Sequence, residues 1–210
     1  ISDMQQVPIR SISVVVPVNN EEASLPFFHQ RLSTALLGQD FDCEIIYVDD
    51  GSSDGSLAFL ARLQAEDPSV AVAVLSRNFG HQAALSAGMD LARGAAVVTL
   101  DADLQHPPEL IPALVEEWRR GAKVVSTVRQ DTEDAGVFKK ASSGLYYRLI
   151  NRLSDTVIEP NAADFRLLDR QALQMLKSMP ERQRFLRGMI GWLGLPEARI
   201  PLAHAAVYIA

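Results

Sequence analysis

The hydrophobic positions along the chain fall into two alternating patterns, which predict strands and helices in turn. Short runs rich in Val and Ile, apolar on both faces, are typical of strands covered by helices on each side. Such runs predict strands at residues 12–18, 44–49, 70–76, 95–101 and 122–128. Helical spacing between them predicts helices near residues 22–37, 54–66, 81–93 and 108–120. This repetition predicts a mostly parallel, doubly wound sheet.

Local signals mark several of the predicted helix ends. Ser53 or Asp54 can cap the second helix, because short polar side chains accept its free N–H groups. Gly94 and Gly121 follow the third and fourth helices, where glycine commonly ends a helix. In a sheet of this kind, ligands bind at the carboxyl ends of the strands.

Charged side chains follow the predicted strands at those ends. They are Glu21 and Glu22 after the first strand, Asp49 and Asp50 after the second, Arg77 after the third, Asp101 and Asp103 after the fourth, and Arg129 after the fifth. Solvated loop charges or helix caps would account for Glu22 and Asp54. They account poorly for Asp101 and Asp103, which directly terminate an apolar strand where an uncompensated charge is costly.

The segment VVTLDADLQHPPEL, residues 97–110, therefore suggests a compensating cation. Carboxylate oxygens suit Mg²⁺ or Mn²⁺ and not Zn²⁺, and Mg²⁺ completes its shell with water and substrate phosphates. A divalent ion shared with a diphosphate would neutralise the acidic pair. Gln105 adds a neutral oxygen, and His106 is either a further ligand or a neighbouring or surface group.

Composition limits the class of protein. The 210 residues, 48% hydrophobic and 22% charged, are enough for one α/β domain with a core. The single cysteine, Cys43, excludes an intramolecular disulfide and is typical of a reducing compartment, where it would fill space in the core. A net charge of −6 argues against nucleic acid as a partner. No run of 18 apolar residues and no signal peptide is present.

The charge is unevenly distributed. Residues 1–136 carry 9 Lys and Arg against 20 Asp and Glu, whereas residues 137–187 carry 10 against 5. Within the basic part, residues 138–153 (FKKASSGLYYRLINRL) combine an apolar stripe with four Lys and Arg. This pattern indicates either an amphipathic helix on an anionic bilayer or a helix that packs on the core with a solvated charged face.

Three other acid-rich α/β classes fit less well. A haloacid-dehalogenase-like phosphatase carries its D-x-D after the first strand and needs a later Lys, whereas here the motif follows the fourth strand. It would release inorganic phosphate through an aspartyl phosphate. A response-regulator receiver needs a Lys that is not apparent here. A dinucleotide-binding Rossmann enzyme needs a glycine-rich turn after the first strand, and PVNNEE has no glycine.

The ordered motifs VVVPVNNEE, VDDGSSDGS, SRNFGHQAALSAGMDLARG, LDADLQHPPELIPAL and ADFRLLDR resemble those of family 2 glycosyltransferases. The resemblance covers residues 11–197. It is closest to the polyprenyl-phosphate glycosyltransferases, a subgroup similar to dolichyl-phosphate mannose synthase and bacterial undecaprenyl-phosphate glycosyltransferases. It implies a GT-A fold, a three-layer α/β/α sandwich around a mostly parallel, doubly wound sheet.

The resemblance also implies roles for individual residues. Pro17, Glu21 and Asp50 match residues of the nucleoside pocket, and Asp101 matches an aspartate near the ribose and diphosphate. Asp103 and Gln105 match ligands of Mg²⁺ or Mn²⁺. Arg129 matches a basic residue near the phosphates, Asp164 a catalytic carboxylate, and Arg182 and Arg187 a basic segment beside the active site. Two positions depart from the family, because Asn19 replaces a usual aromatic residue and His81 a common Lys.

We therefore expect residues 1–210 to form one GT-A catalytic domain. Residues 10–136 would bind the nucleotide sugar, and residues 137–197 would face the acceptor and the membrane. Because the chain begins at Ile1 and stops after an apolar run, we expect it to be part of a longer protein whose membrane helices lie elsewhere. The family's later basic segment is also absent here.

The expected activity is metal-dependent, inverting transfer of a sugar from a nucleoside diphosphate sugar to polyprenyl (undecaprenyl) phosphate. UDP is favoured over GDP, and the expected place is the cytoplasmic face of the cell membrane. The alternatives are a family 2 enzyme with a soluble or polysaccharide acceptor, and a non-catalytic nucleotide-sugar-binding domain. A homo-oligomer is compatible with the sequence, which leaves the oligomeric state open.

Overall fold

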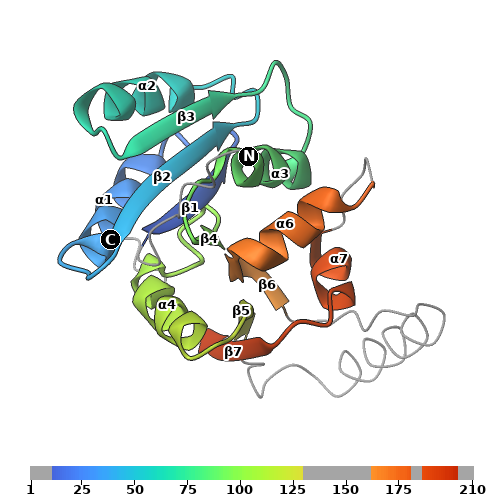
Figure 1. The fold of residues 1–210 in the computed structure, drawn as a ribbon. Coiled ribbons are helices and arrows are strands. Elements are labelled where there is room, and N and C mark those ends of the chain that lie inside the picture. The colour runs from blue at the N-terminus through green and yellow to red at the C-terminus, as the bar shows by residue number, and fades with distance from the viewer. Residues whose placement is uncertain (1–10, 130–161, 181–185, 203–210) are drawn as a thin grey trace, which may run out of the picture.

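The computed structural model describes residues 11–129, 162–180 and 186–202 (Figure 1). The strands are β1 (Ser11–Val18), β2 (Asp42–Asp49), β3 (Val70–Val74), β4 (Ala96–Thr99), β5 (Val124–Arg129), β6 (Ala162–Asp169) and β7 (Glu197–Leu202). The helices are α1 (Leu25–Leu36), α2 (Ser56–Glu66), α3 (His81–Leu91), α4 (Ile111–Arg119), α6 (Arg170–Ser178) and α7 (Leu186–Trp192). A 3₁₀ turn, η1 (Pro108–Leu110), precedes α4.

The strands form one seven-stranded sheet in the order β3-β2-β1-β4-β6-β5-β7. Strands β1 to β4 pair in parallel, and β5 pairs in parallel with β7. Strand β6 runs antiparallel to both of its neighbours, β4 and β5. The predicted mostly parallel, doubly wound sheet is therefore confirmed. The sequence patterns missed β6 and β7, which complete the sheet on the β4 side.

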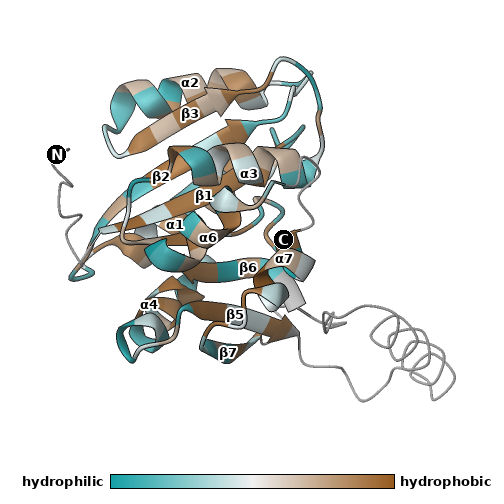
Figure 2. Cartoon of the chain, turned by 45° about the vertical axis from the view of Figure 1, so that its right-hand side comes forward, coloured by the Kyte–Doolittle hydropathy of each residue, from teal (hydrophilic) through white to brown (hydrophobic). Residues whose placement is uncertain are grey.

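Helices cover both faces of the sheet and give the expected three layers (Figures 1 and 2). Alternate residues of a strand point to opposite faces, so Val14 and Val16 pack with α1, α2 and α4, whereas Val15 packs with α3, α6 and α7. Figure 2 shows the resulting pattern, with hydrophobic strands in the middle and hydrophilic residues on the outer parts of helices such as α2 and α4.

Local chemistry fixes where two of the predicted helices begin. In α2 the N-cap residue is Gly55, and the Asp54 carboxylate accepts the N–H of Ser56, the first helical residue, at 3.0 Å. Asp54 thus satisfies one free N–H group, although it precedes the cap position itself. The predicted helix at 108–120 is divided into η1 and α4. Pro112 lies in the first turn of α4, where a proline costs no helical hydrogen bond.

Strand β6 brings its first residues, including Asp164, to the edge of the sheet where ligands are expected to bind. Its antiparallel register pairs Thr99 with Arg166, so its first residues extend past the carboxyl end of β4. The Thr99 hydroxyl donates a hydrogen bond of 2.7 Å to the Asp164 carbonyl and fixes that position. Residues that follow β4 and residues that begin β6 therefore meet at one edge.

Candidate active site

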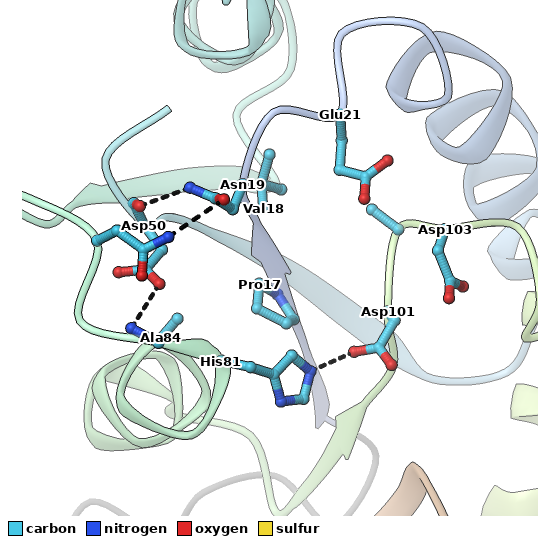
Figure 3. Close-up of a pocket in the computed structure, with 12 residues that line it drawn as sticks. Pro17, Val18, Asn19, Glu21, Asp50, His81, Ala84, Asp101 and Asp103 are labelled. Atoms are coloured by element: carbon cyan, nitrogen blue, oxygen red, sulfur yellow. Dashed lines mark hydrogen bonds and ion pairs between the residues drawn. The ribbon is translucent and has the colours of Figure 1, made fainter. Parts of the chain in front are cut away.

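A pocket of about 310 Å³ opens at the carboxyl edge of the sheet. It lies where β1 separates β2 from β4, the point at which the strand order reverses and a cleft between loops forms. Five predicted site residues line it together (Figure 3): Pro17, Glu21, Asp50, Asp101 and Asp103. The sequence prediction that these residues meet is thus consistent with the structure, although their individual roles stay predictions.

Glu21 enters the pocket wall from the loop that starts α1. Its carbonyl oxygen accepts the N–H groups of Ser24 and Leu25, so the backbone turn at Glu21 begins the helix. The Ser24 hydroxyl donates to the Glu21 carboxylate, and the Ser56 hydroxyl accepts its backbone N–H at 2.9 Å. The Ser24 contact holds the Glu21 side chain, and the Ser56 contact fixes its backbone.

Asp50 ties the end of β2 to the start of α3. Its buried carboxylate accepts the backbone N–H of Phe79 at 2.7 Å and that of Gly80 at 2.8 Å. Charge-assisted hydrogen bonds of this kind are about twice as strong as neutral ones. Asp50 therefore shapes the pocket that it lines by fixing the loop after β3.

Two asparagines continue this wall. The Asn19 side-chain amide donates to the Asp50 carbonyl at 2.8 Å, and the Asn78 amide donates to the Asn19 side-chain oxygen at 3.2 Å. Asn19, which stands where the family usually has an aromatic residue, thus joins three loops through hydrogen bonds. Both amides line the pocket.

Asp101 and His81 form the closest charged contact of the pocket. The His81 Nε2 lies 2.6 Å from an Asp101 carboxylate oxygen (Figure 3). This hydrogen bond raises the pKa of His81 above its ordinary value; partial burial opposes the rise, while the charges of Asp101 and Asp164 support it and Arg187 counters it. The imidazolium form is thereby favoured at the edge where the acids gather.

The D-x-D turn holds its two acids differently. His106 Nδ1 lies 3.6 Å from the second Asp101 oxygen and 4.0 Å from Asp103. His106 is buried and packs its ring against Phe165 of β6, so it is not a surface group. The Asp103 side chain is 34% exposed, against 23% for Asp101. Asp103 therefore offers the more accessible carboxylate.

Gln105 contributes to the turn through its backbone. Its N–H donates to the Asp103 carboxylate at 3.0 Å, and Leu104 between them has a positive φ of 62°. Such a conformation is uncommon for leucine and folds the turn back on itself. Gln105 is exposed and is not among the residues that line the pocket. Its predicted role as a metal ligand stays a prediction.

The donor chemistry of this edge fits a hard divalent cation. Among the described residues, no group of three or more His, Cys, Asp and Glu is placed to enclose a metal. An accessible Asp103 carboxylate on an open pocket instead matches the way Mg²⁺ and Mn²⁺ bind, with one or two carboxylates while substrate phosphates and water fill the other positions. The residues present are therefore compatible with an ion that arrives with its nucleotide.

Asp164 lies beside this pocket in a cluster with two arginines. Arg187 of α7 donates two hydrogen bonds of 2.9 Å to the two oxygens of Asp164, and Arg166 lies 3.3 Å from one of them. Burial alone would raise the pKa of Asp164, but the hydrogen bonds and charge of Arg187, together with Arg166, hold it below the ordinary value. Asp164 is therefore ionised and poorly suited to accept a proton.

The structure describes little or nothing of two further predicted site residues, Arg129 and Arg182, and of the predicted basic helix. Arg129 is the last residue of β5 and its backbone pairs with Leu202, but its side chain lies outside the described residues. Arg182 and the predicted basic helix at 138–153 also lie outside them. Their assigned roles stay predictions. In the described part of the chain, no helix is long and apolar enough to cross a membrane.

Sequence reasoning missed the contacts that organise the site. It noted His81 only as a replacement of Lys, and it did not connect His81 to Asp101. It also assigned Arg187 and Asp164 to separate roles, although they form one bidentate pair. The sequence patterns gathered residues at one sheet edge, but a direct contact between two particular side chains 20 or more positions apart has no signature in a single sequence. The sequence did, however, predict that a helix begins at residue 81, and this helix start places His81 at the edge of the sheet where the pocket lies.

Comparison with known proteins identifies the family of the chain. Residues 13–176 match the profile of the family described as glycosyl transferase family 2. The chain is 40% identical over 188 residues to an uncharacterised glycosyltransferase, YkcC, of Bacillus subtilis, covering 90% of this chain and 58% of the relative. It is 39% identical over 183 residues to a prophage bactoprenol glucosyl transferase homolog of Escherichia coli, covering 87% and 60%.

A third relative is an undecaprenyl-phosphate 4-deoxy-4-formamido-L-arabinose transferase of Klebsiella pneumoniae, 37% identical over 199 residues, with 94% of this chain and 61% of the relative covered. The chain thus spans about three-fifths of the length of the curated relatives it matches.

Solved structures share the fold at low identity. Glucosyl-3-phosphoglycerate synthase from Mycobacterium tuberculosis, in complex with Mn²⁺, UDP and glucosyl-3-phosphoglycerate, superposes with a TM-score of 0.61 at 20% identity, over 93% of this chain and 72% of that one. The mannosyltransferase PcManGT from Pyrobaculum calidifontis, in complex with GDP-Man and Mn²⁺, gives 0.59 at 20%, over 90% and 54%. The expected GT-A fold is confirmed. With its profile, its relatives and this fold in agreement, the chain belongs to glycosyl transferase family 2.

Proposed function

We propose that the protein containing this chain transfers a sugar from a nucleoside diphosphate sugar to polyprenyl phosphate, with inversion at the anomeric carbon. The observation that carries the proposal is the pocket at the strand switch point, which Asp101 and Asp103 line and whose His81 interacts with Asp101 and with the charges of the Asp164–Arg187 pair. The proposed donor pocket and a positively charged side chain that could bind a phosphate, Arg187, would thereby lie at the same edge of the sheet. The relatives named for bactoprenol and undecaprenyl phosphate support this acceptor class.

The donor's orientation follows from the chemistry of the pocket wall. Asp50 and the Asn19 amide lie on one side of the pocket (Figure 3), where Asn78 donates to Asn19. Together they offer the mixed donors and acceptors that a nucleobase edge needs. The carboxylates of Asp101 and Asp103 lie on the other side. The nucleoside therefore occupies the amide side and the diphosphate the carboxylate side. We favour uracil over guanine, as the expected bacterial subgroup implies.

Asp103 is the residue that would hold Mg²⁺ or Mn²⁺, and the Gln105 side chain would join it. Such an ion neutralises negative charge that develops on the diphosphate as the sugar–phosphate bond breaks. The Asp103 carboxylate is partly fixed for this task, because the Gln105 N–H holds one of its oxygens. Arg129, at the end of β5, would add positive charge on the same side.

The acceptor side needs little proton chemistry if the acceptor is a lipid phosphate. A phosphate monoester has a second pKa of about 6, so it is mostly ionised near neutral pH and can attack directly. The low pKa of Asp164 agrees with this view, since Asp164 makes a poor general base. We infer that Asp164 orients Arg187 and that Arg187, with Arg182, receives the acceptor phosphate. Attack on the face opposite the leaving diphosphate inverts the configuration.

Two alternatives remain distinct. A soluble or polysaccharide hydroxyl acceptor would need a general base near the sugar, and the Asp164–Arg187 pair argues against Asp164 in that role. A non-catalytic nucleotide-sugar-binding domain would bind the donor without turnover. The cytoplasmic face of the cell membrane, where a lipid phosphate and a nucleotide sugar would meet, is the place that the proposal implies.

The decisive experiment offers the protein radiolabelled UDP-glucose, Mg²⁺ or Mn²⁺, and undecaprenyl phosphate in detergent. We expect label in the lipid fraction, which chelation of the metal abolishes. Undecaprenol, which lacks the phosphate, should take up none. Replacing Asp103→Asn should lower transfer by at least about a hundredfold, because charge stabilisation of this kind contributes several kcal/mol to the transition state.

Three results would contradict the proposal. Label on the unphosphorylated alcohol or on a soluble glycan would favour the hydroxyl-acceptor alternative. Tight binding of UDP-glucose without any transfer, in the full-length protein, would favour the binding domain. Release of inorganic phosphate without a glycolipid would indicate phosphatase chemistry.

A further inference from the structure

Strand β6 carries a buried guanidinium group that the proposed function leaves unused. Arg166 lies inside the sheet, where it pairs with Thr99 of β4 and Ser126 of β5, and its side chain is buried. Taking a charged group out of water is costly, and a hydrophobic side chain of similar size often gives an equally stable or more stable fold. Stability by itself therefore does not account for an arginine at this position.

Arg166 reaches the pair formed by Asp164 and Arg187 from the inner side. Residues 164, 166 and 168 of β6 point to the same face of the sheet, and Leu168 belongs to the core cluster that also contains residues of α7. Arg166 Nη2 donates to Asp164 Oδ1 at 3.3 Å, and Arg187 Nε donates to the same oxygen at 2.9 Å. Two arginines thus share one carboxylate, one from the sheet and one from the helix that covers it.

The exposure of the three side chains rises outward from the sheet, from 5% for Arg166 to 15% for Asp164 and 38% for Arg187. The Thr99 hydroxyl fixes the backbone carbonyl of Asp164. The carboxylate could still turn about its own side-chain bonds and carry Arg187 with it. Arg166 opposes this rotation, because a side chain inside a close-packed core has little room to move. Asp164 therefore holds the most exposed of the three residues in one direction.

We propose that Arg166 is a positioning residue for the acceptor: it holds the Asp164 carboxylate, which in turn orients Arg187 toward the phosphate of a lipid acceptor. This inference rests on the proposed function, since it assumes that Arg187 receives that phosphate. Arg166 is buried behind Asp164 and acts only through it. Loss of Arg166 should therefore weaken the binding of a lipid phosphate and leave nucleotide binding unchanged.

The test is isothermal titration of the wild type and of Arg166→Met with farnesyl phosphate, with farnesol, and with UDP and GDP in the presence of Mg²⁺. Farnesol has the same hydrocarbon tail without the phosphate, so we expect the wild type to bind it much more weakly than farnesyl phosphate. Arg166→Met should bind farnesyl phosphate about tenfold more weakly than the wild type does, because a charge-assisted hydrogen bond is partly lost. Its affinity for the nucleotide that binds the wild type should be unchanged.

Two further variants separate positioning from packing. Arg166→Lys keeps a positive charge behind the carboxylate, and its affinity for farnesyl phosphate should return to within about threefold of the wild type. In an Asp164→Asn background, Arg166→Met should cause no further loss of affinity, because residues that act through one another are not additive.

Unfolding in urea gives a second readout. When Arg166 is replaced by Met, Asp164 keeps both hydrogen bonds from Arg187, so its charge stays paired. We therefore expect the free energy of unfolding of Arg166→Met to equal or exceed that of the wild type, as is common when a hydrophobic residue replaces a buried charge. A purely structural arginine would give the opposite result.

Arg170→Met is the matched control. Arg170 follows β6 at the opposite edge of the sheet, where its N–H donates to the Ala95 carbonyl and its guanidinium donates to the carbonyls of Ala92 and Gly94. Its replacement leaves these two carbonyls without that donor. The variant should lower the free energy of unfolding and leave the affinity for farnesyl phosphate unchanged.

Three outcomes would overturn the inference and leave the proposed function in place. They are wild-type affinity of Arg166→Met for farnesyl phosphate, an equal loss of farnesyl phosphate and nucleotide affinity, and an Arg166→Met protein that is less stable than the wild type or does not fold. If the wild type binds farnesyl phosphate no better than farnesol, the proposed acceptor class and the inference both fall. If binding depends on Arg166 as expected but no glycolipid forms in the transfer assay, only the proposed transfer falls.

Discussion

At the scale of single residues, the active edge is organised by acids that already have partners. Asp50 accepts two backbone N–H groups, Asp101 contacts His81, and Asp164 is held by Arg187. These contacts answer the difficulty of placing carboxylates at the end of a buried strand, because a paired or hydrogen-bonded charge costs far less than an isolated one. Asp103 is the most accessible of them, and it is the residue that we propose as a metal ligand.

A substitution of Asp164 tests its role in the reaction. Because its pKa is low and Arg187 occupies both of its oxygens, Asp164→Asn removes an orienting charge and not a proton acceptor. Because Arg187 is proposed to receive the acceptor phosphate, we expect the variant to lose more activity with a lipid phosphate than with a hydroxyl acceptor, each compared with the wild type in the transfer assay. Equal losses with the two acceptors would contradict this expectation.

The same pair predicts a pH dependence of stability. A carboxylate whose pKa is lowered in the folded state stabilises the fold above its unfolded pKa, and this contribution is lost as the pH falls through the lower, folded value. The melting temperature of the wild type should therefore exceed that of Asp164→Asn at pH 7 and at pH 5, and the gap should narrow only below the ordinary aspartate value of about 3.9. A gap that is constant down to pH 2.5 would exclude this contribution.

At the scale of elements, the pocket depends on how closely α3 approaches the sheet. Gly88 makes this approach possible, because a Cβ at this position would lie 2.3 Å from a Val15 methyl group and 2.9 Å from a Val48 methyl group. Both valines belong to buried strands and have little room to move. The position of His81, at the start of the same helix, follows from this packing.

Gly88→Ala should destabilise the protein by about 1–3 kcal/mol, since overpacking outweighs the better helix propensity of alanine. The free energy of unfolding in urea measures the effect. Gly94→Ala is the comparison, and it should cost more, because the added Cβ would lie 2.5 Å from the Ser13 backbone nitrogen, which cannot rotate away as a side chain can. A Gly88→Ala protein as stable as the wild type would show that α3 can shift outward without cost.

At the scale of the whole molecule, the net charge changes sign between two parts of the sequence. The acidic residues 1–136 contain the strand ends that form the pocket, whereas the basic residues 137–187 contain Arg187 and the sequence 138–153. In the proposed function, a lipid acceptor would bring its phosphate to Arg187, which pairs with Asp164 within the basic part. Attraction of the basic part to an anionic bilayer would orient the donor pocket toward the membrane surface.

This view predicts binding to vesicles. The protein should sediment with vesicles that contain an anionic lipid more than with neutral ones, and 0.5 M salt should weaken the binding, because added ions screen the attraction. Replacing Lys139 with Gln should reduce it, while Arg62→Gln on α2 removes the same single charge at a remote position and should not. Absent or salt-insensitive binding would favour a helix that packs on the core.

The sequence by itself determined the parallel sheet and the residues at its carboxyl edge. Val- and Ile-rich runs report burial on both faces, and an acid directly after such a run can only lie at a strand end. These are local properties of the chain, so the sites at Asp50, Asp101 and Asp103 could be named in advance. Family resemblance added their expected roles, and it singled out Asp164 and Arg187.

Only the tertiary structure decided which of these residues meet. The antiparallel entry of β6 brings Asp164 past the end of β4, and α7 places Arg187 on its carboxylate. Likewise, the packing of α3 on the sheet sets His81 against Asp101. Contacts of this kind join segments far apart in the chain, and their geometry depends on the whole core, which no local pattern of residues encodes.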